Sequence, residues 1–453
     1  MRNITDDFID QLDKLRLQKR SDEEIKQVKR VLLDYLGVTF AGAKMLSKRS
    51  ISLLQDLNGN ERGAIVIGLN RKANLGSTAL INGLHSHVAE LDDGDRYGMF
   101  HPGAPLFSVL LPLAEMYEEE RHNFFDAIIT GYEASVLLAR SMQPETKDKG
   151  FHGTGIFGTV GAAIAAGVFF GFSKDKLKHT LGAAATSASG LLKVIKDGSE
   201  MKPFNVATAS QNALNAVLLV KAGFQGPDDV LAGDKGLLGA FKESYNPDRL
   251  LQELNNNNLN PAIFGIYMKP YAACRHAHPA VEAAITLKEK HNIDPDSIEK
   301  ITVSTYYWAV EGHDHTDIKG VGSAKMSTPY SVAVGYIRGK AGLNEFREER
   351  IKDQNVLSLT RRVSVYEDNE LSELVPDKRG AIVVVKTTNN ELYSYRIDLP
   401  KGEPETRLTD EELRNKFSEM LTYAEIPDRA VKIIDAVEEL NKNSGLSKLF
   451  ALL

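Results

Sequence analysis

The segment FHGTGIFGTVGAA, residues 151–163, belongs to a run from Gly150 to Ser173 that contains no formally charged residue. Its glycines match the G-x-G-x-x-G pattern of dinucleotide-binding folds. That pattern requires a strand before the glycines and an acidic residue about 20 residues after them. Here the polar stretch SMQPETKDKGFH precedes them, without any alternation of strands and helices. The segment therefore predicts a buried helix whose glycines let neighbouring helices approach closely, rather than a dinucleotide site.

By length alone this uncharged run could cross a bilayer, since about 20 apolar residues suffice for a transmembrane helix. Its repeated glycines and the polar His152 weaken that reading. A buried helix of a large helical domain explains the run better.

Length and composition exclude several classes of protein. The chain has 453 residues, of which 42% are hydrophobic and 26% charged, with a net charge of −6. This length predicts two or three domains, and no basic surplus is available to bind nucleic acid. The single cysteine, Cys274, excludes an intrachain disulfide, and the acidic N-terminus is unlike a secretory signal. We expect a cytoplasmic protein.

The predicted fold class is mainly α with a second, α+β domain. Residues 1–262 are predicted to be helical: SDEEIKQVKRVLLDYLG opens with a capping box of Ser21 and Glu24, and FFDAIITGYEASVLLARSM keeps helical spacing. Many of these helices are rich in Ala, Gly, Ser and Thr, which predicts a tightly packed bundle.

Residues 263–404 are predicted to form the smaller α+β domain. SIEKITVSTYYWAV, RRVSVYED and AIVVVKTTNNELYSYRIDL indicate strands, the last as a hairpin that turns at residues 388–390. The stretch LNNNNLNP, residues 254–261, is the expected linker. Helices within residues 405–453 are expected to pack back on the helical domain.

Polar side chains gather in HSHVAELDDGDRYGMFHPGAP, residues 85–105. Three interpretations remain open: a metal site, an acid–base site, or a solvated helix end with acidic residues. His85 and His87 are two positions apart, so they do not share one face of a helix. This spacing argues against chelation by the pair.

Further candidates stand at predicted helix starts. His152 begins the glycine-rich helix, where exposed N–H groups and the helix dipole favour an anionic ligand. Lys202, Lys269 and His278 each precede a proline that can open a helix. A lysine at a helix N-terminus is unfavourable with respect to the dipole, and a bound anion would offset that cost. Each lysine alone is typical of a surface, but together with His101 and His152 they predict a cationic pocket for a multiply charged carboxylate.

Tyr330 lies in the first turn of the helix predicted in STPYSVAVGY. It is either a half-buried aromatic at a domain interface or a phenol that orients a carboxylate or passes a proton.

Six stretches, in this order, resemble the MmgE/PrpD family: LLDYLGVTFAG, HSHVAELDDGDR…HPGAP, FHGTGIFGTVGAA, DGSEMKPFNVATASQNA, KPYAACRHAHPAVEA and STPYSVAVGY. The resemblance covers most of the chain. It implies a large all-helical domain, a smaller lid-like α+β domain, a homodimer, and neither a metal nor an organic cofactor.

Carried over motif by motif, the resemblance also implies site residues. The implied catalytic set is His101, His152, Lys202, Lys269 and Tyr330, and the implied substrate contacts are Asp93, Arg96, Cys274 and His278. His101, of the HP motif, would be the proton donor. The chain departs from the pattern expected of the family's decarboxylases at Cys274, where a further histidine is expected, and at Gly94, where a threonine is expected. The stretch from Asp93 to His101 is also one residue longer than expected.

The reactions of this family share one requirement, because charge develops on a carbon next to a carboxylate. Fixed positive charge and a group that exchanges a proton near neutral pH meet that requirement. The leading prediction is cofactor-independent decarboxylation of cis-aconitate to itaconate. The alternatives are dehydration of 2-methylcitrate, epimerisation of iminodisuccinate, and carboxylate binding without catalysis.

Overall fold

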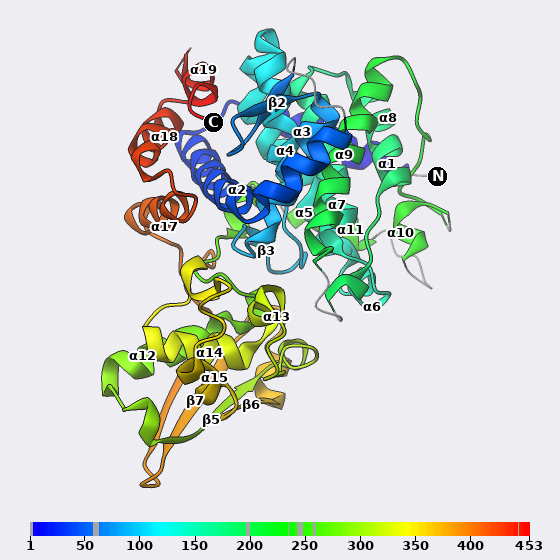
Figure 1. Cartoon of the computed structure of the whole chain (residues 1–453). Helices are drawn as coiled ribbons and strands as arrows, with labels where there is room; N and C mark the ends of the chain where they lie inside the picture. The colour runs from blue at the N-terminus through cyan, green and yellow to red at the C-terminus, as the bar shows by residue number, and fades with distance from the viewer. Residues whose placement is uncertain are drawn as a thin grey trace. The chain divides into compact units, whose positions relative to one another are not determined.

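The computed structural model describes residues 3–57, 63–195, 200–233, 235–241, 248–256, 260–442 and 444–453. The chain is mainly helical and carries a small mixed sheet in its C-terminal part (Figure 1). It forms two compact units: the first combines Met1–Lys193, Met201–Ile266 and Asp410–Leu453, and the second consists mainly of Tyr267–Thr409. Part of the expected linker, residues 257–259, lies outside the described residues.

The first unit is helical apart from a few short strands. Its helices are α1 Ile4–Arg16, α2 Asp22–Asp56, α3 Leu75–Val88, α4 Gly103–Met116, α5 Phe124–Met142, α6 Glu145–Asp148, α7 Gly153–Phe169, α8 Lys174–Ser187, α9 Lys202–Lys221, α10 Leu237–Ala240, α11 Asp248–Asn256, α17 Asp410–Tyr423, α18 Ala430–Glu438 and α19 Gly445–Phe450. Its strands are the antiparallel pair β1 Ala64–Val66 and β2 Arg71–Ala73, and β3 Gly94–Asp95; β4 Ile266–Tyr267 falls at the boundary between the units.

Helix α7 is the predicted glycine-rich helix, and all its residues are buried. It packs against α4, α5, α8 and α9. A Cβ added at Gly155 would lie 2.0 Å from the Ser189 carbonyl oxygen, and one at Gly158 would lie 2.6 Å from Pro105 Cγ. The glycines therefore permit close packing, as predicted, and α6 rather than a strand precedes them. In the described part of the chain, no helix combines the length and apolarity that crossing a membrane requires.

Local sequence signals in the first unit are confirmed. The Ser21 hydroxyl accepts from the Glu24 N–H at 3.2 Å, and the Glu24 carboxylate accepts from the Ser21 N–H at 2.7 Å, which completes the capping box of α2. Helix α5 spans the whole predicted stretch. The C-terminal helix α17 packs against α2, and a buried ion pair of Lys416 with Asp34 joins the two.

The second unit is built on a four-stranded sheet of order β6-β5-β7-β8. Its strands are β5 Ile298–Thr305, β6 Val363–Glu367, β7 Ala381–Thr387 and β8 Leu392–Ile397, and its helices are α12 His278–His291, α13 Val321–Met326, α14 Thr328–Arg338, α15 Gln354–Thr360 and α16 Asn369–Glu373. The β5–β6 pair is parallel and the other pairs are antiparallel. The predicted β7–β8 hairpin is confirmed, and Asn390 adopts the left-handed conformation in its turn. Helix α12 packs against β7 and β8.

Candidate active site in the helical unit

Three histidines of the first unit lie against one another, and we call them the histidine cluster. His87 lies in the last turn of α3, His101 lies two residues before α4, and His152 is the N-cap of α7. The ring centroid of His87 is 5.0 Å from that of His101 and 5.9 Å from that of His152. Residues from distant parts of the sequence are thus brought together here.

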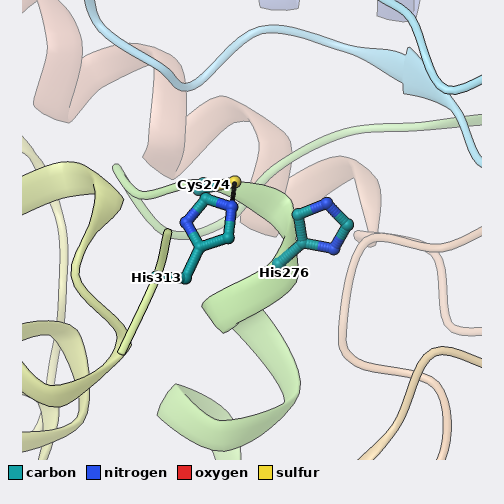
Figure 2. Close-up of side chains that lie close together, drawn as sticks. All are labelled: Cys274, His276 and His313. Atoms are coloured by element: carbon teal, nitrogen blue, oxygen red, sulfur yellow. Dashed lines mark hydrogen bonds between the residues drawn. The ribbon is translucent and has the colours of Figure 1, made fainter. Parts of the chain in front are cut away.

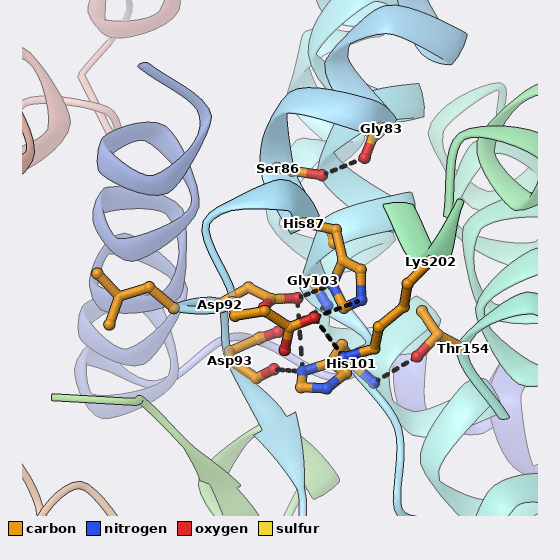
Figure 3. A network of polar contacts seen from close by, with 12 residues as sticks. Gly83, Ser86, His87, Asp92, Asp93, His101, Gly103, Thr154 and Lys202 are labelled. Carbon is orange, nitrogen blue, oxygen red and sulfur yellow. Dashed lines mark hydrogen bonds and ion pairs between the residues drawn. The ribbon is translucent and has the colours of Figure 1, made fainter. Parts of the chain in front are cut away.

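Asp92 connects two of these rings (Figure 3). Its Oδ2 accepts from His87 Nδ1 at 2.7 Å and lies 3.4 Å from His101 Nδ1. His101 Nδ1 also donates to the backbone carbonyl of Asp93. Because these oxygens only accept, each neutral ring carries its proton on Nδ1, and proton exchange at His101 falls to Nε2. The backbone N–H of His101 donates to Thr154 Oγ1 at 3.1 Å, and this hydrogen bond fixes the backbone from which the ring extends.

His152 has the opposite arrangement of its ring nitrogens. Its Nδ1 lies 3.2 Å from the amide nitrogen of Asn205, which also donates to the Leu191 carbonyl at 3.3 Å. Nδ1 therefore accepts and the proton sits on Nε2. Burial lowers the pKa of His152 well below its usual value, and the nearby His87, Lys202 and His101 add to the effect. His152 is consequently a neutral N–H donor near neutral pH.

Lys202, the first residue of α9, extends toward His101 (Figure 3). Its ammonium group forms an ion pair with Glu90, and both side chains are nearly buried. The anion that offsets the unfavourable position of this lysine is thus supplied by the chain itself, which the sequence argument did not foresee. Glu90 adopts a left-handed backbone conformation, with φ of 54°, which a non-glycine residue rarely does without constraint from its surroundings.

The carboxyl group of Asp93 bonds to groups outside the histidine cluster. Its carboxyl group accepts from the Tyr132 hydroxyl at 2.6 Å and from the Gly103 N–H at 3.1 Å. Burial raises the pKa of Asp93 to about 8, with the neighbouring Asp92 and Asp34 adding to the rise and the two hydrogen bonds opposing it. Asp93 thereby fixes the start of α4 and the loop that carries His101.

The starts of three helices converge on this cluster. Asp93 binds the first N–H of α4, Thr154 of α7 binds the His101 backbone, and Asn205 of α9 binds His152, the N-cap of α7. Helix N-termini present unpaired N–H groups and a positive dipole end. Together with Lys202 and the His152 N–H, they create a setting suited to a carboxylate beside His101.

Two further residues of the acidic stretch, His85 and Arg96, contact groups outside the histidine cluster. His85 Nε2 lies 2.8 Å from Ser50 Oγ, away from Asp92, and burial lowers the pKa of His85 to about 3. The separation of His85 from His87 is therefore as the spacing predicted. Arg96 is buried, with its guanidinium over the Tyr97 ring at 5.0 Å. A different set, His87, Asp92 and His101, has ligand-type atoms within 4.8 Å of one another, but the hydrogen bonds through Asp92 account for that proximity.

Four sequence candidates belong to the second unit. Lys269 and His278 are buried, and His278 Nε2 donates to the Ala273 carbonyl at 3.1 Å. The buried hydroxyl of Tyr330 donates to the Glu345 carbonyl at 2.9 Å, and burial raises its pKa above the usual value. Cys274 is partly exposed and donates its backbone N–H to the Lys325 carbonyl. Their roles toward a substrate remain predictions from the sequence.

Three residues that position the site, Asn205, Thr154 and Tyr132, were not predicted from the sequence. Asn205 lies one helical turn after Lys202, and that i, i+3 spacing was the available signal. Thr154 belongs to the quoted segment beside His152 but was not singled out. For Tyr132, in the middle of an apolar helix, no local signal distinguishes it from a core aromatic.

Comparison with known proteins defines the class. The model of the MmgE/PrpD N-terminal domain matches residues 6–250, and that of the MmgE/PrpD C-terminal domain matches residues 271–442. The chain therefore belongs to the MmgE/PrpD family. It is 24% identical to the cis-aconitate decarboxylase-like protein of Aspergillus oryzae, over 100% of this chain and 97% of that protein. It is also 24% identical to the cis-aconitate decarboxylases of Mus musculus and Homo sapiens, over 99% of this chain and 93% and 95% of theirs.

Proposed function

We propose that this protein is a lyase that decarboxylates cis-aconitate to itaconate, with His101 as the proton donor. The observation that carries the proposal is the histidine cluster: His101 directs Nδ1 at the oxygens of Asp92 and Asp93, which assigns proton exchange to Nε2, and Lys202 extends toward this ring (Figure 3). The decarboxylase names of the full-length relatives support the choice of substrate. The family resemblance also supports a cytoplasmic homodimer that works without a cofactor.

The proposed chemistry needs only groups present in the chain. The bond between the CH₂ carbon and its carboxylate breaks and releases CO₂, and the electron pair forms a new double bond to the central carbon. The former double bond moves its electrons to the vinyl carbon, which takes a proton from His101 Nε2. Lys202 and the neutral His152 N–H would bind the carboxylates that remain and stabilise the negative charge as it develops.

Asp92 is a positioning residue in this scheme. It accepts from the His87 ring and lies beside His101 Nδ1, so it orients the rings and favours a cationic His101 before the proton is transferred. Lys269, from the second unit, is proposed as a further carboxylate contact on the strength of its motif alone.

Incubation with cis-aconitate in ²H₂O, followed by ¹H NMR, tests the proposal. We expect itaconate with one deuterium on the methylene next to the distal carboxylate, because His101 exchanges its proton with solvent before it protonates that carbon. A parallel incubation with 2-methylcitrate separates decarboxylation from dehydration. Turnover of 2-methylcitrate alone, or of neither compound, would rule the decarboxylase out.

A further inference from the structure

A second group of chemically reactive side chains lies in the second unit, and we call it the thiol cluster: Cys274, His276 and His313 (Figure 2). One ligand-type atom of each lies within 4.8 Å of the others. Cys274 Sγ is 3.9 Å from His313 Nε2, and the ring centroids of the two histidines are 5.2 Å apart. Cys274 is the N-cap of the 3₁₀ turn Arg275–Ala277 and His276 lies inside this turn, whereas His313 comes from the loop between β5 and α13.

Both imidazole rings are held by the nitrogen that faces away from the sulfur. His313 Nδ1 donates to the Met326 carbonyl at 2.8 Å, so its Nε2 carries the lone pair toward Cys274. His276 Nδ1 lies 2.6 Å from the hydroxyl of the fully buried Tyr306. Histidines that bind metals usually donate their second N–H to a carboxylate, a backbone carbonyl or water, as His313 does, and this fixes the tautomer and the ring orientation.

We propose that Cys274, His276 and His313 form a zinc-binding site. Zinc–sulfur and zinc–nitrogen bonds of about 2.3 and 2.05 Å at a tetrahedral angle place sulfur and nitrogen about 3.6 Å apart. The observed 3.9 Å between Cys274 Sγ and His313 Nε2 is close to that separation, so small side-chain movements suffice. One thiolate with two imidazoles suits Zn²⁺, and three protein ligands leave a fourth position for water or an anion.

Two buried arginines, Arg275 and Arg379, lie near the cluster and both act on Tyr306, the hydrogen-bond partner of His276. Arg275, inside the same turn, forms a buried ion pair with Glu403, so its charge is balanced locally. Loss of the thiol proton on binding supplies one further negative charge. The proposal gives Cys274 a role that differs from the substrate contact implied by the family motif. None of its three residues belongs to the histidine cluster, so loss of Zn²⁺ binding and loss of the lyase activity can be measured separately.

The test uses the full-length protein after treatment with a chelator. Co²⁺ serves as a spectroscopic probe, because a thiolate ligand gives a charge-transfer band, and Zn²⁺ affinity follows from competition with a chromophoric chelator. We expect one equivalent of metal per chain and a thiolate band. Cys274→Ser and His313→Gln should each weaken Zn²⁺ binding by at least about 100-fold, since loss of second-shell partners alone typically costs about 10–100-fold. The matched control His291→Gln removes an exposed histidine of α12 and should leave affinity unchanged.

Alkylation of wild-type protein gives a readout that does not depend on variants. Cys274 is the only cysteine, so mass spectrometry after iodoacetamide treatment reports this thiol alone. Stoichiometric Zn²⁺ should slow its alkylation at least about 10-fold, because the metal occupies the nucleophilic lone pair of the thiolate. Absence of stoichiometric binding, binding that survives both ligand substitutions, or alkylation unaffected by Zn²⁺ would overturn the site.

Discussion

His87, Asp92 and His101 of the first unit bring three ligand-type atoms within 4.8 Å of one another, and so does the thiol cluster of the second unit. The hydrogen bonds made by the inward-facing nitrogens differ between the two groups. Around Asp92, the His87 and His101 nitrogens that face inward carry protons directed at oxygen atoms. Around Cys274, the inward nitrogen of His313 carries a lone pair, because its other nitrogen donates to a carbonyl. The hydrogen bonds of each ring therefore decide whether its inward nitrogen presents a proton, as around Asp92, or a lone pair, as in His313.

The largest effect is expected for His101→Gln, which removes the nitrogen proposed to deliver the proton. Loss of a general acid lowers kcat by about 10²–10⁴-fold. Steady-state itaconate formation measures the loss, and Co²⁺ binding at the thiol cluster should be unchanged in the same variant. The matched control His122→Gln replaces an exposed histidine of the same unit. Activity near the wild-type rate in His101→Gln would remove the proton-donor role and with it the contrast between the two clusters.

Lys202→Met is expected to act next most strongly, because it removes the charge that we propose binds a substrate carboxylate. Charge-assisted hydrogen bonds contribute about 1.5–3 kcal/mol, so kcat/KM should fall by about 10–100-fold, mainly through KM. The single variant leaves Glu90 nearly buried without its ion-pair partner, so thermal stability should also fall. Glu90→Gln combined with Lys202→Met should recover the stability without recovering kcat/KM. Lys149→Met, at an exposed position, is the control, and an unchanged KM in Lys202→Met would argue that Lys202 serves only Glu90.

Features that depend on neighbouring residues could be predicted from the sequence. The bounds of α5, the capping box of α2, the β7–β8 hairpin and the position of His152 at the start of α7 all follow from local spacing. Hydrophobic periodicity and capping side chains act within a few residues, so one sequence is enough to find them.

The hydrogen-bond and ion-pair partners within the site, which depend on tertiary contacts, could not be predicted. The sequence placed Asp92 in an acidic stretch, but nothing local indicates that it joins His87 to His101. Tyr330 was placed correctly in the first turn of α14, whereas the partner of its hydroxyl, the Glu345 carbonyl, lies in a later segment. The pairing of Lys202 with Glu90 likewise joins elements far apart in the chain. Residue type and spacing thus identify candidates, and hydrogen-bond partners assign their chemistry.

Gly155→Ala tests whether close packing of α7, the helix that begins at His152, is required for stability. The new Cβ would lie 2.0 Å from a backbone oxygen, that of Ser189, which cannot move as a flexible side chain could. Overpacking of this kind costs about 1–3 kcal/mol of unfolding free energy, measurable by urea denaturation. Gly322→Ala is the matched control, because nothing lies within 4 Å of its new Cβ in α13. Equal stability of the two variants would mean that the glycines of α7 are not required for packing.

The smallest expected effect is a pH-dependent change in stability caused by Asp93. Protonation of Asp93 determines how much negative charge lies next to the histidine cluster. Burial raises the pKa of Asp93 from 3.8 to about 8. The folded state therefore binds a proton that the unfolded chain releases, and this contribution to stability is full below about pH 4 and is lost as the pH rises toward 8. Asp93→Asn cannot titrate, so its melting temperature relative to the wild type should rise between pH 5 and pH 8. The exposed Asp148→Asn should show no such trend. A melting-temperature difference between Asp93→Asn and the wild type that does not change with pH would mean that the hydrogen bonds from Tyr132 and Gly103 keep the Asp93 carboxylate ionised throughout. The charge of Asp93 near His101 would then be independent of pH.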